Sequence, residues 1–298
     1  MLDCIIIGGG PAGLSAGLVL GRSLRRAVIL DHGRPRHART RHSHGFLTRD
    51  GASPAEFRQI AHQELSEYPS ISMMQEEVVE VQPVYGGFIA RMSSGRETAG
   101  RKVLLSTGLR EILPSLPGLE EYYGQSLFSC PYCDGYELRG KRLVLLAETM
   151  NVFSTAQMIH HWSKDLVICT NGKRILNVEQ HKRLVSRGIR VVEQPISKLS
   201  GSNGRLEAIW FRNGQTIERE GGFVTPQLSQ ASMIGPRMGC HMNDRGALIT
   251  DHYGRTNIRG IYAAGDSTVT SPTQLIIAAA EGSKAAIGIN MDLVYEDF

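Results

Sequence analysis

The sequence contains few cysteines and no long hydrophobic run. Its 298 residues include five cysteines, of which only Cys130 and Cys133 lie close together. A small secreted domain held by disulfides carries a dense, even-numbered set, so we expect an intracellular, cytoplasmic protein. No apolar stretch approaches the roughly 20 residues that cross a bilayer, and no basic leader with a cleavage site precedes the first apolar run. We therefore expect neither a signal peptide nor a membrane partner.

A large excess of charge of one sign is also missing. The formal net charge is only +4, which does not suggest a nucleic-acid-binding protein. No repeat or low-complexity segment stands out. The hydrophobic fraction of 41% and the length suit two domains of ordinary size, each with its own buried core.

The N-terminal segment has the pattern of a dinucleotide-binding unit. An apolar run at Cys4–Ile7 predicts a buried parallel strand, Leu14–Leu20 predicts a helix, and Ala27–Leu30 predicts the next strand. Between the first strand and the helix lies Gly-x-Gly-x-x-Gly, where the glycines allow a tight turn, close approach of a pyrophosphate and close helix–strand packing. The helix N-terminus offers free N–H groups to the anion, and the acid after the second strand is placed to bind a ribose hydroxyl. The residues expected here to bind the cofactor are Gly8, Gly10, Pro11, Ala12, Gly13 and Asp31.

Later segments predict the rest of an α/β fold. The segment 103–108 reads as a buried strand ending in a tight turn, and 260–266 as a late strand ending at a functional turn. Lys141–Ala147 and Asp165–Thr170 read as strands with a helix between them, which makes a second βαβ unit. Ile276–Ile289, rich in alanine and glycine, predicts a tightly packed final helix.

The pair Cys130 and Cys133 allows three interpretations. A zinc site needs two further ligands with matching spacing, and none is present, so we expect no metal. A buried pair of structural thiols is a second possibility. The third is a redox dithiol, in which the short loop permits disulfide closure and lowers the pKa of one thiol. The neighbouring Asp134 favours this reading, because it could move a proton as thiolate and thiol interconvert.

At this point the chain resembles the low-molecular-weight thioredoxin reductases, a family of two-dinucleotide-binding flavoproteins. The resemblance is carried by the first fingerprint, the Thr107-Gly108 turn, Cys-x-x-Cys-Asp-Gly, the late Ala-Gly-Asp and the final helix. It implies an α/β fold in which a discontinuous FAD-binding domain (1–114 and 228–298) holds an inserted NAD(P)-binding-like domain (115–227) carrying the cysteines. It also implies FAD, a homodimer and a thioredoxin-like protein or a small dithiol or disulfide as partner.

The resemblance also implies roles for single residues. Cys133 would contact the flavin, Cys130 would attack the partner disulfide, and Asp134 would be the acid. Asp266 would bond the ribityl chain, and the start of the final helix would face the flavin. Further residues implied at the cofactor are Thr107, Gly108, Gly265, Asp266 and Gln274.

A related branch, the dithiol oxidases that close disulfides in small metabolites, is also similar to this chain. That resemblance is carried by Gly33–Arg36, by His44–Gly51 and by Cys-Pro-Tyr-Cys. It places His44 among the cofactor-binding residues. Members of this branch often carry histidine after the second cysteine, whereas this chain has Asp134, as the reductases do.

The second nucleotide fingerprint is missing. Where NADPH-dependent members have glycines after the first strand of the inserted domain, this chain has Ala147, Thr149 and Val152, and Glu148 adds negative charge. We therefore do not expect NADPH to bind. The resemblance offers a second FAD in the former NADPH site, or ferredoxin, as the electron donor. The basic stretch Arg34–Arg49 could attract such an acidic partner or be a solvated loop with some arginines near the FAD phosphates.

Three functional hypotheses follow. The leading one is an FAD-dependent disulfide oxidoreductase of thioredoxin reductase type that does not depend on NADPH. The second is a dithiol oxidase that passes electrons from small dithiols to oxygen. The third is a flavin-binding protein whose dithiol is vestigial.

Overall fold

The computed structural model describes residues 1–268 and 272–298, which divide into two compact units. Unit 1 comprises Met1–Ala38, Gly45–Arg110 and Leu228–Phe298, and unit 2 comprises Arg39–His44 and Glu111–Gln227. The division differs from the expected domain boundaries at 39–44 and 111–114, which group with unit 2. That unit 1 binds FAD stays a prediction.

Unit 1 is built on a mixed sheet whose strands are β1 (Leu2–Ile7), β2 (Ala27–Leu30), β3 (Ile71–Met74), β4 (Val78–Val84), β5 (Gly87–Met92), β6 (Glu97–Leu105) and β17 (Ile261–Ala263). The order is β3-β2-β1-β6-β5-β4, and β17 pairs with β6. The first half of β6 pairs antiparallel with β5, and its second half pairs parallel with β17. The predicted strands at 4–7, 27–30 and 103–105 are therefore neighbours, and their carboxyl ends meet at one edge.

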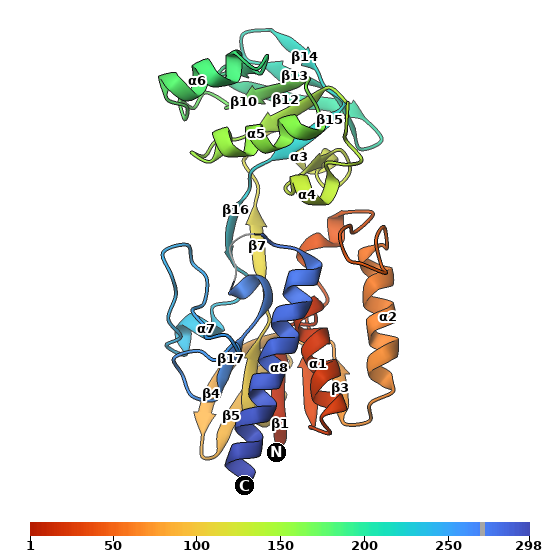
Figure 1. Ribbon diagram of the computed structural model, residues 1–298, viewed down its shortest axis with the longest axis vertical. Helices are drawn as coiled ribbons and strands as arrows, with labels where there is room; N and C mark the ends of the chain where they lie inside the picture. The colour runs from red at the N-terminus through yellow and green to blue at the C-terminus, as the bar shows by residue number, and fades with distance from the viewer. Residues whose placement is uncertain (269–271) are drawn as a thin grey trace. The chain divides into compact units, whose positions relative to one another are not determined.

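Helices α1 (Pro11–Arg22) and α8 (Leu275–Asp297) pack side by side against this sheet (Figure 1). Small residues permit the close approach: a Cβ on Gly282 of α8 would lie 1.9 Å from the backbone oxygen of Ala12. The helix α2 (Pro54–Ser66) begins with a capping box between Ser53 and Glu56, worth about 1 kcal/mol. The remaining unit 1 elements are α7 (Ile234–Arg237), η2 (Gly265–Ser267) and η1 (Arg36–Arg39), whose last residue groups with unit 2.

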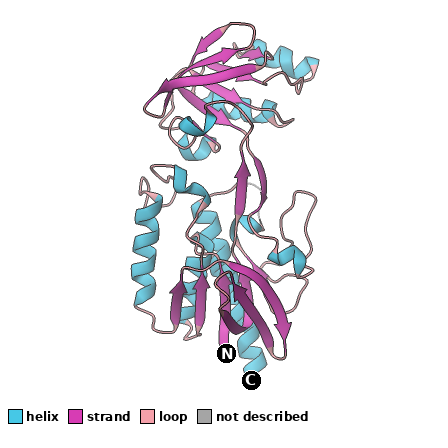
Figure 2. Ribbon diagram, turned by 180° about the vertical axis from the view of Figure 1, so that it is seen from behind, coloured by secondary structure: helices cyan, strands magenta, loops and turns pink. Residues whose placement is uncertain are grey.

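Unit 2 contains a parallel sheet in the order β11-β10-β9-β15-β8. Its strands are β8 (Leu127–Phe128), β9 (Leu143–Leu146), β10 (Leu166–Cys169), β11 (Arg190–Val192) and β15 (Gly221–Val224). Helix α5 (Val152–Trp162) connects β9 to β10, and α6 (Val178–Val185) lies between β10 and β11. This is the predicted second βαβ unit, and Figure 2 shows its strands and helices by colour.

Other unit 2 elements were not predicted. An antiparallel sheet of β12 (Ile196–Ser202), β13 (Arg205–Phe211) and β14 (Thr216–Glu218) closes the apolar core formed with β9 and β10. Short helices α3 (Leu119–Tyr122) and α4 (Pro131–Asp134) flank β8. The chain passes between the units in β7 (Leu109–Ile112) and β16 (Gln227–Gln230), which pair with each other. No helix in the described part of the chain is long and apolar enough to span a bilayer.

Candidate functional site

The glycine-rich turn of unit 1 has the geometry that a pyrophosphate site requires. Gly8 has φ +109°, and a Cβ there would lie 2.4 Å from the backbone oxygen of Ser106. A Cβ on Gly13 would lie 1.9 Å from the backbone oxygen of Gly8, so only glycine fits where α1 crosses β1. A Cβ on Gly10 would meet nothing within 4 Å. Gly8 and Gly13 shape the turn, and Gly10 leaves the open space that a phosphate group needs.

The start of α1 is suited to an anion. Gly10 is the N-cap, Pro11 occupies the first turn, and no acidic residue lies in that turn. The N–H groups at the start of a helix lack partners within the helix and carry partial positive charge. The residues present therefore fit the pyrophosphate of FAD.

Asp31 lies directly after β2, beside this turn. A Cβ on Gly9 would lie 2.9 Å from the Cβ of Asp31, which shows how closely the two segments approach. Arg58 of α2 donates to the Asp31 carboxylate at 2.6 Å, and both side chains are about four-fifths buried. The pair holds the carboxylate at the edge of the sheet where a ribose would bind.

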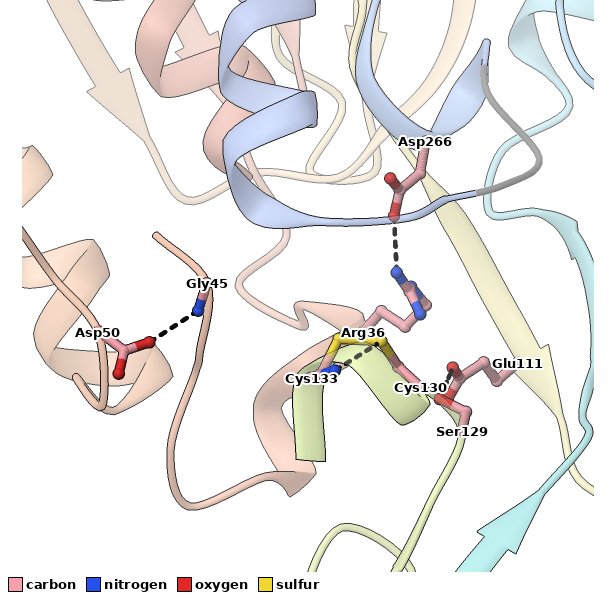
Figure 3. Close-up of a disulfide and its surroundings, with 8 residues drawn as sticks. All are labelled: Arg36, Gly45, Asp50, Glu111, Ser129, Cys130, Cys133 and Asp266. Carbon is pink, nitrogen blue, oxygen red and sulfur yellow. Dashed lines mark hydrogen bonds and ion pairs between the residues drawn. A yellow bond between two sulfur atoms is a disulfide. The ribbon is translucent and has the colours of Figure 1, made fainter. Parts of the chain in front are cut away.

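Asp266 follows the late strand β17 and forms a similar pair. The Arg36 guanidinium donates to its carboxylate at 2.7 Å, as Figure 3 shows. Gly265 has φ +72°, and a Cβ on it would lie 2.8 Å from the Cβ of Ala12, so this turn packs tightly on α1. Burial and the charges of Arg36 and Arg58 lower the pKa of the neighbouring His37 to about 4, which keeps that imidazole neutral at pH 7.

The turn after β6 completes this cluster. The backbone N–H of Gly108 donates to the Ser267 hydroxyl at 2.8 Å, and Thr107 lies 3.5 Å from the same hydroxyl. A Cβ on Gly108 would lie 4.0 Å from the Cβ of Asp266. Gln274 is the N-cap of α8. The structure thus gathers the unit 1 residues predicted for the cofactor at the carboxyl ends of β1, β2, β6 and β17.

In unit 2, Cys130 and Cys133 form a disulfide with 5.3 Å between their Cα atoms. Cys130 caps the short helix α4, and the backbone N–H of Cys133 donates to the Cys130 sulfur at 3.2 Å. Pro131 takes the first helical position, where it needs no N–H partner. After reduction, the N–H of Cys133 would stabilise a thiolate on Cys130.

Asp134 ends α4, directly after the second cysteine. Burial, with a smaller contribution from the Glu137 carboxylate, raises the pKa of Asp134 to about 7. A carboxyl group with such a pKa can both donate and accept a proton near neutral pH, which is the property required of the acid beside a dithiol.

Aromatic residues fix the cysteine loop within unit 2. The rings of Tyr132 and Trp162 meet edge to face, with 5.8 Å between their centroids. A Cβ on Gly135 would lie 2.8 Å from the Trp162 ring, so glycine lets α4 pack on the end of α5. Arg139 lies over the ring of Tyr136 at 4.0 Å. Tyr132 and Tyr136 remain largely exposed beside the disulfide.

His44 groups with unit 2, whereas the other residues predicted for the cofactor group with unit 1. Its Nε2 lies 3.8 Å from a carboxylate oxygen of Glu137. The structure therefore associates His44 with the loop that follows the cysteines, and its role at the flavin stays a prediction.

The second nucleotide-type turn is filled by side chains. Ala147 and Val152 are buried at the end of β9 and the start of α5. The side-chain amide of Asn171, just after β10, donates to the Glu148 carboxylate at 2.8 Å and accepts from the backbone N–H of Ile196 at 2.9 Å. This bridge places a carboxylate at the carboxyl ends of the strands, where a dinucleotide would approach the sheet. That NADPH does not bind here stays a prediction.

Several contributors to these sites were not predicted. Arg58 and Ser267 position the unit 1 cluster, and Glu111 and Ser129 bond to each other next to Cys130. Each acts through a contact with a residue far away in the sequence, so no local motif identifies it. No group of three or more potential metal ligands occurs among residues 1–268 and 272–298.

Comparison with known proteins gives a consistent result. The sequence profile of the family described as "Pyridine nucleotide-disulphide oxidoreductase" matches residues 2–282. A "probable thioredoxin reductase" of Arthroderma benhamiae is 28% identical over 99% of this chain and 81% of its own length. The thioredoxin reductase sirT of Leptosphaeria maculans is 28% identical over 100% of this chain and 96% of its own length.

Solved structures agree with this. A protein from Bacillus anthracis described as "putative thioredoxin reductase TrxB" is 40% identical, with a TM-score of 0.96 and 100% coverage of both chains. The structure of HlmI is 32% identical, with a TM-score of 0.94, and covers 99% of this chain and 93% of its own.

Proposed function

Because the chain belongs to the pyridine nucleotide-disulphide oxidoreductase family, as a thioredoxin reductase-like flavoenzyme, we propose that its Cys130–Cys133 pair exchanges electrons with FAD without NADPH as the donor. The observation that carries the proposal is the bridge from Asn171 to Glu148. It supports the loss of the NADPH site because it adds a fixed carboxylate, and buried side chains replace glycines in the turn.

Residues of unit 1 would hold the cofactor. The turn at Gly8, Gly10 and Gly13 would receive the pyrophosphate, Asp31 a ribose, and Asp266 the ribityl chain. FAD, when bound, supplies a two-electron carrier for the dithiol. Arg58 would orient Asp31 by the ion pair described above.

The reductive direction runs through both cysteines. The thiolate of Cys130 attacks one sulfur of the partner disulfide, so that a mixed disulfide forms and the partner's other sulfur leaves as a thiolate. Cys133 then attacks the Cys130 sulfur, which re-forms the Cys130–Cys133 disulfide and releases the second thiolate. The partner gains two electrons and two protons, and Asp134 would accept the proton that Cys133 loses as it attacks. We propose a thioredoxin-like protein or a small disulfide as the partner.

The charge distribution bears on the electron donor. Arg34, Arg36 and Arg39 of the basic stretch each lie within 4 Å of a carboxylate, so internal pairs offset much of its charge. The α5–α6 side of unit 2 carries further cations. Arg183 lies over the Phe153 ring at 5.3 Å, and neither Arg183 nor Arg187 pairs with an acid in the described part of the chain. The positive charge on this side favours an acidic electron donor such as ferredoxin. The other donor we consider is a second FAD in the former NADPH site.

Anaerobic titration tests the proposal. Dithionite should reduce the flavin and then yield two reactive thiols per chain, whereas excess NADPH should leave the flavin oxidised. Cys133→Ser should abolish electron transfer to a disulfide, and Cys240→Ser, which changes a buried thiol elsewhere, should not. Rapid bleaching of the flavin by NADPH would overturn the proposal. A count of one flavin per chain would favour an external donor, and a count of two would favour a second FAD.

A dithiol oxidase is the second candidate. The exposed rings of Tyr132 and Tyr136 beside the disulfide favour it, because they offer an apolar surface to a small dithiol. Two electrons and two protons would then pass from the dithiol through the cysteines and FAD to oxygen, giving hydrogen peroxide. Peroxide formed in proportion to dithiol would support this direction, and a panel of dithiols that yields none would exclude it. If neither direction proceeds, the dithiol is vestigial.

We also propose that the protein is a homodimer. Helix α8 carries an exposed apolar stripe that includes Ile276, Ile287 and Val294. Equilibrium sedimentation of the full chain tests this proposal. A monomer at all concentrations would refute it.

A further inference from the structure

Glu111 of β7 is bound through both of its carboxylate oxygens. The Ser129 hydroxyl donates to Oε1 at 3.0 Å, and the Tyr123 hydroxyl donates to Oε2. Tyr123 is buried, and all three residues belong to unit 2. Figure 3 shows the Glu111 carboxylate turned toward Ser129, next to Cys130.

This network holds the chain at the residue that precedes Cys130. Ser129 links the end of β8 to the N-cap of α4, so its bond to Glu111 fixes the loop from outside the helix. The bond from the Cys133 N–H to the Cys130 sulfur fixes it from inside. The turn that carries Tyr123 is tied to β8 as well, because the Gly124 N–H donates to the Leu127 oxygen at 2.8 Å. Glu111 thus joins three segments around the first cysteine.

Glu111 also places a carboxylate against the residue that precedes Cys130, whose sulfur must ionise to react. A negative charge disfavours a nearby thiolate, and hydroxyl groups that donate to the carboxylate reduce this effect. The Glu111 carboxylate therefore raises the pKa of the Cys130 thiol. The hydroxyls of Ser129 and Tyr123 make this rise smaller, because they donate hydrogen bonds to the carboxylate. Other ionisable groups that surround the cysteine pair in unit 2 are Tyr132, Asp134, Glu137, His44 and His161.

We propose that Glu111, held by hydrogen bonds from Ser129 and Tyr123, is a positioning residue whose charge sets the pH at which Cys130 becomes a nucleophile. The inference rests on the proposed dithiol role of Cys130. It can fail while that role stands, because the test below requires neither turnover nor an electron donor.

The experiment measures alkylation of Cys130 by iodoacetamide against pH, in the FAD-loaded full chain carrying Cys133→Ser. Peptide masses separate Cys130 from the buried cysteines at 4, 169 and 240. Glu111→Gln should shift the midpoint of the rate profile to lower pH by about 0.5 unit, because a negative charge is removed. Ser129→Ala retains the carboxylate and removes one donor, so the midpoint should rise. The exposed Glu120, changed to Gln, is the control and should leave it in place.

Glu111→Gln and Ser129→Ala should move the midpoint in opposite directions. A purely structural role would instead make both variants loosen the loop and change the midpoint in the same way. The proposal is overturned if Glu111→Gln behaves like Glu120→Gln, or if Glu111→Gln and Ser129→Ala move the midpoint the same way. If Glu111→Gln does not fold, Ser129→Ala and Tyr123→Phe, which retain the charge, decide the matter. Both must raise the midpoint, and a profile unchanged from the parent refutes the inference.

Discussion

Asn171 donates its side-chain amide to the carboxylate of Glu148 at 2.8 Å, across the carboxyl ends of β10 and β9. In a nucleotide-binding βαβ unit this space receives the ligand. Here the protein fills it with its own hydrogen bonds, and the same asparagine also accepts from the backbone of β12. Asn171 thus links the carboxyl ends of β9 and β10 to the first strand of the antiparallel sheet in unit 2.

Asn171→Ala should therefore destabilise unit 2. Asn171 has φ +50°, so alanine would add backbone strain, and Asn203 supplies a matched control with the same φ. The side chain of Asn203 makes no hydrogen bond within the described residues. Asn171→Ala should cost about 1–3 kcal/mol more than Asn203→Ala, because a carboxylate and an N–H lose their partner. The protein's two tryptophans, Trp162 and Trp210, lie in unit 2, so their fluorescence during urea unfolding measures this difference. Equal losses would show that the bridge contributes nothing.

The pKa of Asp134 predicts a pH-dependent stability. It rises from an ordinary 3.8 to about 7 in the folded protein, so the folded chain holds a proton between these values that the unfolded chain has released. Stability should fall as the pH rises from about 4 to about 7 and stay constant above that. Asp134→Asn removes this titrating group. The melting temperature of the variant should therefore exceed that of wild type at pH 8 and equal it at pH 4.

The control for this prediction is Asp244→Asn, which changes an exposed aspartate in unit 1. Its melting temperature should track wild type at both pH values. A constant offset for Asp134→Asn across the range would mean that the asparagine acts by packing and that the carboxyl group titrates normally. Glu137→Gln should lower the pKa of Asp134, since one of its two causes is removed.

The sequence predicted those parts of the fold that a local pattern encodes. Continuous apolar runs at 4–7, 27–30 and 103–105 identified central parallel strands because both faces of such strands are buried. The strands β12 to β14 were not predicted, since their buried and exposed residues alternate over short segments and their outer faces are polar. Glycine spacing predicted the turn at Gly8–Gly13 because Gly8 and Gly13 each lie against a backbone oxygen that leaves no room for a side chain.

Contacts between distant residues could not be predicted in this way. Arg58 lies 27 positions from Asp31, and Arg36 lies 230 positions from Asp266, yet each pair meets at the same sheet edge. The bond from Ser129 to Glu111 spans 18 positions and depends on where β7 leaves unit 1. Such pairs follow from the completed topology, and a single sequence carries no separate signal for them.

The end of α8 gives a further prediction for unit 1. Lys102 is almost fully buried, and its ammonium group lies 2.6 Å from the Glu296 carboxylate. Glu296→Gln would leave that cation without its nearest anion and should destabilise unit 1 by about 3 kcal/mol. Asp297→Asn breaks more exposed pairs with Arg25 and Arg101 and should destabilise unit 1 less than Glu296→Gln does. Hydrogen–deuterium exchange of the backbone amides of β1 and β6 measures the loss of stability in each variant. Equal protection of these amides in the two variants would contradict the prediction.

The glycines of the first fingerprint separate cofactor binding from folding. Gly10 has φ −79° as the N-cap of α1, and a Cβ there meets no atom within 4 Å. Gly10→Ala should therefore fold with the stability of wild-type apoprotein and lose FAD affinity by at least tenfold, because the methyl group enters the space reserved for the pyrophosphate. In Gly13→Ala the methyl group would lie 1.9 Å from the Gly8 oxygen, so α1 must move and the apoprotein itself should be less stable.

The measurements are the flavin content after purification, FAD titration of the apoprotein and thermal unfolding of the apoprotein. Gly95→Ala is the control, because a Cβ there also meets nothing within 4 Å but the residue lies in a turn far along the chain from the fingerprint. Its φ of +84° makes a small loss of stability the expected result, with FAD affinity unchanged. If Gly10→Ala retains full FAD affinity, the phosphates bind elsewhere and the assignment of unit 1 as the FAD-binding unit loses its main support. If it instead loses apoprotein stability as Gly13→Ala does, the open space at Gly10 is needed by the fold and not by the cofactor.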